Sequence, residues 1–81
     1  IHGPREREEL DRALAALSPS QRAALLLREW EGRSFREIAA MLRCKEGTAR
    51  VHHTRACARM RKELRGGSIR FRASRPEGQT I

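Results

Sequence analysis

Three residues, Arg43, Cys44 and Lys45, separate two segments that both carry helical signals. The segment before them opens with Ser34 and Glu37 at the spacing of a capping box, in which each side chain bonds the other residue's backbone N–H. The segment after them, 46–64, repeats small or apolar residues at steps of three and four. A connection of three residues allows only a tight turn, so the two helices must cross and pack directly on each other. This pair constrains the fold more than any other feature.

Two further helices are expected before this pair. The first covers about 5–16, and acids near its start complement the helix dipole. Ser18 and Gln21 form a second capping box, with Pro19 at the first helical position. The helix that they open runs to about Glu31, where Gly32 supplies the stop. The residues expected on buried faces are Leu10, Ala13, Leu14, Leu17, Leu25, Leu26, Trp30, Phe35, Ile38, Ala39, Leu42, Ala49, His53, Ala56, Met60 and Leu64.

The fold class predicted is all-α, a compact four-helix domain that contains a helix-turn-helix. A chain of 81 residues allows one small domain. We assign the domain to residues 1–65, because Gly66 and Gly67 end the last helix. Residues 66–81 are rich in Gly, Ser, Arg and Pro, so they are expected to form a flexible basic tail.

Positive charge is concentrated on the last predicted helix. The chain carries a net charge of +8. Residues 43–65 hold eight basic side chains against two acidic ones, a net +6, whereas residues 1–32 hold five basic against six acidic, a net −1. A basic stripe on one helix is typical of a phosphate-binding surface. The alternative is an ordinary solvated helix.

Several classes of protein are disfavoured. The longest apolar run, 23–27, is too short to span a bilayer, and no signal-peptide pattern is present, so a cytoplasmic protein is expected. No nucleophile–base constellation is visible, and the adjacent His52 and His53 point in different directions on a helix, so an enzyme is not expected. Cys44 and Cys57 form no CxxC pair and are expected as reduced thiols. No cofactor and no metal site is predicted.

Four motifs together resemble one family. They are residues 17–22 (LSPSQR), 31–39 (EGRSFREIA), 46–50 (EGTAR) and 55–56 (RA), and Leu26–Glu29 and Met60 add to them. This pattern is similar to region 4, the C-terminal domain of bacterial sigma factors, and is closest to the extracytoplasmic-function class. The resemblance covers about residues 10–65. It implies binding of the −35 promoter element, docking on the flap of the RNA polymerase β subunit, a role in transcription initiation, and regulation by an anti-sigma factor.

The chain departs from the family pattern at three positions. Lys45 stands where a serine usually caps the recognition helix, which costs about 1 kcal/mol unless phosphate contacts compensate. His53 stands on the inward face where the family has an aliphatic residue, and we expect a hydrogen-bonded core histidine there. Val51 replaces a small polar residue, so the base preference is expected to differ.

The resemblance places one face of the fourth helix in the major groove. Arg50 and Arg55 are the first candidates for base recognition, because arginine can bond guanine N7 and O6 together; phosphate contact is the alternative for each. The full base-reading set is Arg50, Val51, Thr54 and Arg55. The phosphate-binding set is Arg33, Ser34, Lys45, Thr48 and His52, with Ser34 also explained as a helix cap. Arg59, Arg61 and Lys62 lie further along the helix and are interpreted mainly as solubility residues.

A second surface is predicted on the first two helices, where the apolar residues exceed the needs of a small core. This hypothesis is a groove for the β flap or an anti-sigma helix. Its residues are Leu10, Leu14, Leu17, Leu25, Leu26 and Trp30; the alternative is that all six are ordinary core.

Two other functions stay open. A LuxR-type response-regulator domain is also a four-helix helix-turn-helix protein, but it usually forms a dimer on a palindromic site. Residues 20–22, Phe35 and residues 55–56 fit the sigma pattern better. The other alternative is a protein-interaction module whose basic helix binds an acidic partner.

Overall fold

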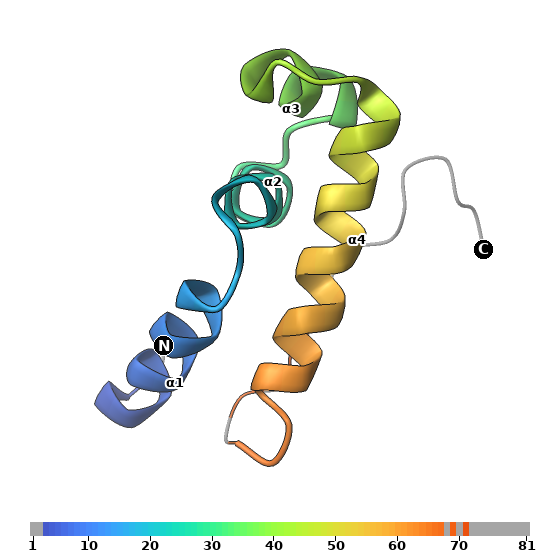
Figure 1. Ribbon diagram of the computed structural model, residues 1–81. Helices are drawn as coiled ribbons and strands as arrows, with labels where there is room; N and C mark the ends of the chain where they lie inside the picture. The colour runs from blue at the N-terminus through green and yellow to red at the C-terminus, as the bar shows by residue number, and fades with distance from the viewer. Residues whose placement is uncertain (1–2, 68, 70, 72–81) are drawn as a thin grey trace, which may run out of the picture.

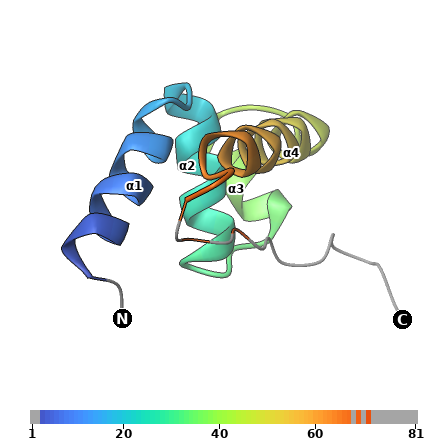
Figure 2. The ribbon, with the colours of Figure 1, turned by 90° about the horizontal axis from the view of Figure 1, so that it is seen from below.

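The computed structural model describes residues 3–67, 69 and 71, and these contain four helices and no strand. The helices are α1 (Pro4–Ala15), α2 (Pro19–Glu29), α3 (Phe35–Leu42) and α4 (Glu46–Glu63). In Figure 1, α4 forms a long rod, and the other three helices lie along one side of it. Figure 2, with α4 viewed nearly end-on, shows the same arrangement from below. The predicted all-α, four-helix class is confirmed.

Both predicted capping boxes are formed. Gln21 N–H donates to Ser18 Oγ and Ser18 N–H donates to Gln21 Oε1, each at 3.2 Å. Glu37 N–H donates to Ser34 Oγ at 3.1 Å, and Ser34 N–H donates to Glu37 Oε1 at 3.0 Å. The backbone N–H of Ser34 lowers the pKa of the Glu37 carboxyl from its usual value. This bond therefore contributes to stability above the ordinary carboxyl pKa and loses that contribution as the pH falls through the lowered value.

Three of the helices, α2, α3 and α4, are followed by a residue whose backbone has a positive φ, in the left-handed region. Arg43 adopts φ 56° at the end of α3, and Cys44 N–H closes the turn on Ala39 O at 2.9 Å. Gly32 has φ +68° in the turn after α2, and Gly66 has φ +81° after α4. The second helix was predicted to reach Glu31, but α2 ends at Glu29, and Arg33 N–H bonds back to Leu27 O at 3.0 Å.

The core consists of two clusters along α4. The lower cluster joins α1, α2 and the second half of α4, and the upper cluster joins α2, α3 and the start of α4. The predicted inward face of α4 is confirmed, since Ala49, His53, Ala56, Met60 and Leu64 are all buried. The lower cluster is Ala13, Leu17, Leu25, Ala56, Cys57, Met60 and Leu64, and the upper cluster is Ala24, Phe35, Ile38, Ala39 and Ala49.

Trp30 was expected in the core, and that prediction was wrong. Its side chain is 59% exposed. Trp30 follows the buried Leu25 by five residues, which places it about 140° around the helix from the packed face. It also lies at the C-cap, where the chain leaves the helix. Ala24, which the sequence pattern did not assign to the core, is fully buried.

The chain turns back toward the core after α4. Gly67 N–H donates to Leu64 O at 3.1 Å, and a Cβ on Gly67 would lie only 2.7 Å from Glu9 Oε2. Ile69 and Phe71 then pack against the lower cluster. The packed part of the chain therefore includes two side chains beyond the boundary predicted at residue 65. Residues 72–81 of the predicted tail lie outside the described residues.

Candidate nucleic-acid interface

Helices α3 and α4 form the helix-turn-helix, with Arg43, Cys44 and Lys45 as its turn. Ile38 and Ala39 of α3 meet Ala49 of α4 in the upper cluster, and Phe35 closes the same cluster. These contacts brace the first turns of α4 against α3. With 18 residues, α4 is about 27 Å long, so only part of it can enter one stretch of major groove.

Three of the four predicted base-reading residues are exposed on α4. Val51 is 43% exposed, and Thr54 and Arg55 are also exposed. They point away from the inward face of α4, as the helical spacing predicted. The structure thus presents an apolar, a hydroxyl and a guanidinium group on adjacent turns of one helix.

Arg50, the fourth predicted base reader, is engaged within the protein. Its Nη1 donates to Glu46 Oε2 at 2.8 Å, and its guanidinium carbon lies 5.1 Å from the centre of the Phe35 ring. A base contact requires Arg50 to exchange Glu46 for the base. Arg55 forms no ion pair with any described residue, so its guanidinium is available without such an exchange.

The predicted phosphate-binding residues lie just before α3 and at the start and in the second turn of α4. Arg33 and Ser34 lie before α3; the guanidinium of Arg33 pairs with Glu31 at 3.3 Å and with Glu37 at 3.7 Å. The Ser34 hydroxyl accepts from the Glu37 N–H, so its role as a helix cap is confirmed. Lys45 and Thr48 are exposed at the start of α4, and His52 is half-buried.

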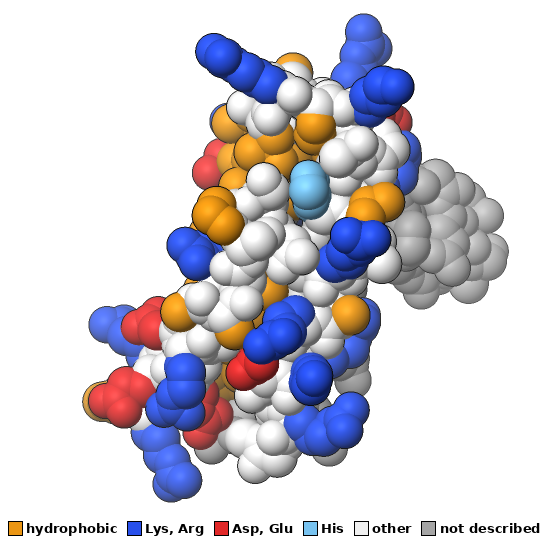
Figure 3. All heavy atoms as spheres, viewed as in Figure 1, with side chains coloured by type: hydrophobic (Ala, Val, Ile, Leu, Met, Phe, Trp, Pro, Cys, Tyr) orange, Lys and Arg blue, Asp and Glu red, His pale blue; other side chains and the backbone are white. Residues whose placement is uncertain are grey.

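The charge is distributed unevenly over the surface. In Figure 3, lysine and arginine side chains follow the visible face of α4 and surround α3, while acidic side chains, mixed with basic ones, gather at the end where α1 lies. This agrees with the net charge of +6 over residues 43–65. The basic face adjoins the exposed residues of α4 and would attract a DNA backbone.

Lys45 occupies the N-cap of α4 without a side-chain cap bond, as the sequence predicted. We expect Lys45→Ser to stabilise the domain by about 1 kcal/mol, because a serine oxygen can accept an orphan N–H of the first turn. The same change removes a cation beside the candidate DNA-binding residues of α4, so DNA affinity should fall while stability rises. Urea denaturation and a DNA-binding titration check the two effects. Lys45→Ala, which loses the charge and supplies no cap, is the matched control: it should lose affinity without gaining stability.

His53 connects α4 to α2 beneath the exposed face. His53 Nε2 lies 2.7 Å from Glu29 Oε2, and the two side chains are only 10% and 12% exposed. The Phe35 ring meets the imidazole edge-on with centroids 5.3 Å apart. The predicted hydrogen-bonded core histidine is confirmed. The sequence did not reveal Glu29 as its partner, because the two residues are 24 positions apart and belong to different helices.

The two cysteines are free. Cys57 Sγ lies 3.5 Å from His53 Nε2, but burial, with the charge of Glu29, raises the pKa of the Cys57 thiol to about 11. The thiol is therefore protonated near neutral pH and is a poor nucleophile. Among the described residues, no group of three or more His, Cys, Asp or Glu side chains could hold a metal ion. No helix in this same part of the chain is long and apolar enough to cross a membrane.

The six residues predicted to line a partner groove do not form one open surface. Leu17 and Leu25 are 3% and 0% exposed and belong to the lower cluster, so this part of the prediction was wrong. They are buried because α1 and α2 both pack on α4. Leu10 and Leu14 are half-buried against the same cluster. Leu26 is also half-buried, and only Trp30 is well exposed.

Comparison with known proteins places the chain in a family. The family model described as "Sigma-70, region 4" matches residues 7–60. The chain is 42% identical over 60 residues to the RNA polymerase sigma-E factor of Streptomyces avermitilis, and 41% identical over 61 residues to that of Streptomyces antibioticus. The match to the sigma-E factor of Streptomyces coelicolor is 42% over 60 residues.

These matches cover 74–75% of this chain but only 34% of each relative, so the chain spans about a third of the length of the curated relatives it matches. The region matched by the family model contains α2 and α3 whole, most of α1, and α4 as far as Met60. The chain therefore belongs to the sigma-70 region 4 family, in the extracytoplasmic-function class that its motifs indicated.

Proposed function

We propose that this domain recognises the −35 element of a promoter and helps a sigma factor to direct RNA polymerase to its start site. The observation that carries the proposal is the exposed face of α4, where Val51, Thr54 and Arg55 project from a braced helix-turn-helix. Family membership supports the same function. The domain acts by binding and has no catalytic role.

The chemistry of this face suits base recognition. A guanidinium can bond N7 and O6 of one guanine, and a valine side chain can contact a thymine methyl. The phosphate-binding candidates lie just before α3 and over the N-cap and first two turns of α4. Phosphate contacts there would fix the register of α4 in the groove.

Docking on the β flap of the polymerase, or on an anti-sigma factor, is the second part of the proposal. Fewer residues support it than the sequence suggested, since Trp30 alone of the six predicted groove residues is well exposed. Tryptophan is enriched among residues that anchor protein interfaces. Leu26, half-buried in α2, lies four residues before Trp30, a spacing that places the two side chains on the same side of the helix.

Selection from random duplex DNA separates the candidate functions. A short, non-palindromic preferred motif supports a monomer that recognises a −35 element. A palindrome supports a dimer of the LuxR type. Binding that falls steeply with salt but shows no preferred sequence leaves α4 as an electrostatic surface, which would favour the protein-interaction alternative.

Arg55→Ala is the variant that tests the base-reading assignment. We expect a loss of about 1–3 kcal/mol on the preferred duplex and a relaxed preference at one base pair. Arg61→Ala is the control, because it removes the same charge from a residue outside the assigned face and should change affinity little. An equal loss on every duplex would reduce Arg55 to a phosphate contact.

A further inference from the structure

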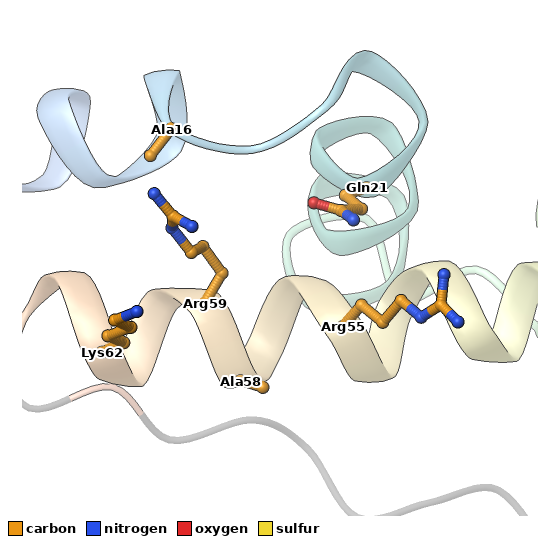
Figure 4. Close-up of a pocket in the computed structure, with 6 residues that line it drawn as sticks. All are labelled: Ala16, Gln21, Arg55, Ala58, Arg59 and Lys62. Carbon is orange, nitrogen blue, oxygen red and sulfur yellow. The ribbon is translucent and has the colours of Figure 1, made fainter.

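A basic pocket lies where the junction of α1 and α2 faces the second half of α4 (Figure 4). It encloses about 330 Å³. Two alanines, Ala16 and Ala58, leave room in it, and α4 contributes cations at spacings of four and three residues. The lining residues are Ala16, Gln21, Arg55, Ala58, Arg59 and Lys62, and none of these carries a carboxylate.

The groups that face this pocket are hydrogen-bond donors. Gln21 Oε1 already accepts from Ser18 N–H, so the amide Nε2 is the group that Gln21 can offer. Arg59 binds Glu63 through Nε at 2.8 Å, which leaves its Nη groups for a ligand. Lys62 forms no ion pair within the described part of the chain. Donors and positive charge favour an oxyanion. The carboxylate of Glu63 is its competitor at Arg59.

We propose that this pocket binds one phosphate of the DNA backbone, with Arg59 and Lys62 as the contacting residues. The proposal rests on the proposed DNA-binding function and extends its interface. Arg55 belongs both to the base-reading set and to the pocket lining, so the two surfaces are continuous. Arg59 and Lys62 follow Arg55 by about 6 and 10.5 Å along the helix axis.

The dimensions fit a phosphate that runs past the recognition face. A DNA strand presents one charge for about every 3.4 Å of its axis, so a strand alongside α4 passes several phosphates beside these two turns. The pocket is open to solvent, and its volume of about 330 Å³ leaves room for a phosphate group. Arg59 and Lys62 thus gain a binding role in place of the solubility role that their sequence position suggested.

The first test is the salt dependence of binding to the preferred duplex. The double variant Arg59→Ala/Lys62→Ala should flatten the log–log slope by about two and leave the base preference unchanged. Its affinity relative to the unmodified protein should recover by about tenfold between about 50 and about 200 mM salt. The matched control is Arg61→Ala/Arg65→Ala, which removes two charges from the same end of α4 outside the pocket. Equal changes in slope for the two double variants would overturn the proposal.

A second test moves the charge change to the DNA. Single phosphates of the preferred duplex are replaced, one at a time, by uncharged methylphosphonates. Replacement at one position should lower the DNA affinity of the unmodified protein and should not change the affinity of the Arg59→Ala/Lys62→Ala variant. Glu63→Gln, which removes the carboxylate that competes for Arg59, should raise affinity and increase the sensitivity at that same position.

The outcomes separate this proposal from the function on which it rests. If the unmodified protein prefers one sequence but no methylphosphonate position depends on Arg59 and Lys62, the pocket proposal alone fails. If the unmodified protein shows no preferred sequence, the proposed function fails and the pocket proposal fails with it. Inorganic phosphate or a polyglutamate peptide that binds the pocket, without any sensitive DNA position, would identify another source of the anion and also overturn the proposal.

Discussion

Ile38→Ala is expected to lower the free energy of unfolding by about 2–5 kcal/mol and to remove sequence-specific DNA binding. Ile38 is fully buried in the upper cluster, where α2, α3 and the start of α4 meet. Deleting its outer carbons removes buried apolar surface and leaves a cavity that the surrounding helices fill only in part. A domain of this size has a total stability of about 3–10 kcal/mol, so the loss is a large fraction of it.

The functional loss has a separate cause. Ile38 and Ala39 support Ala49, and Ala49 fixes the first turns of α4 relative to α3. A shift of α4 relative to α3 moves the base-reading side chains away from the phosphate-binding residues before α3. The two sets can then no longer contact the same duplex at once. Urea denaturation followed by far-ultraviolet circular dichroism gives the stability, and a binding titration at low temperature, where the variant stays folded, gives the affinity.

Met41→Ala is the matched control, because Met41 belongs to the same helix but is 53% exposed. Substitution there should change stability by less than about 0.5 kcal/mol. If Ile38→Ala and Met41→Ala lower the free energy of unfolding equally, the upper cluster does not hold the helix-turn-helix together.

Local signals in the sequence predicted the helices well. Both capping boxes are built from residues three positions apart, so their partners can be identified without knowledge of the fold. The inward face of α4 was predictable for a similar reason, since steps of three and four place residues on one side of any helix. The three-residue turn between α3 and α4 then fixed the helix-turn-helix, because so short a connection leaves few packings.

Burial on α2 was harder to predict than the helices themselves, because it depends on how α1, α3 and α4 all pack around α2. Leu25, Leu26 and Trp30 all have apolar side chains, but α4 covers only the face that carries Ala24 and Leu25. The return of Ile69 and Phe71 to the core was missed for a related reason. Two glycines indicate a helix stop in the sequence, whereas the direction of the chain after them depends on Gly66 at positive φ and on the close approach of Gly67 to Glu9.

The base-reading set rests on the family resemblance and on the helical spacing of its residues, and neither shows which side chains are already engaged. Arg50 and Arg55 were equal candidates in the sequence. In the structure, Glu46 and the ring of Phe35 hold Arg50, and Arg55 lies exposed beside the basic pocket. The structure therefore favours Arg55 for the first substitution.

His53→Leu is expected to cost about 2–3 kcal/mol of stability, although leucine resembles the aliphatic residue usual at this position. The substitution leaves the Glu29 carboxylate, whose side chain is 12% exposed, without the imidazole that lies 2.7 Å from it. Removing one partner of a buried pair is costly because the remaining charge is poorly solvated. Glu29→Gln is the milder comparison, since the amide keeps a hydrogen bond to the ring and removes only the charge.

The double variant His53→Leu/Glu29→Met decides whether the pair itself is the cause. Replacing both members of a buried pair with apolar side chains is often close to neutral. The double variant should therefore regain most of the stability that His53→Leu loses, with a coupling energy of at least about 1 kcal/mol in a double-mutant cycle measured by urea denaturation. If the two losses simply add, His53 stabilises the domain through its packing on Phe35 and Cys57, and the link to Glu29 contributes nothing to holding α2 against α4.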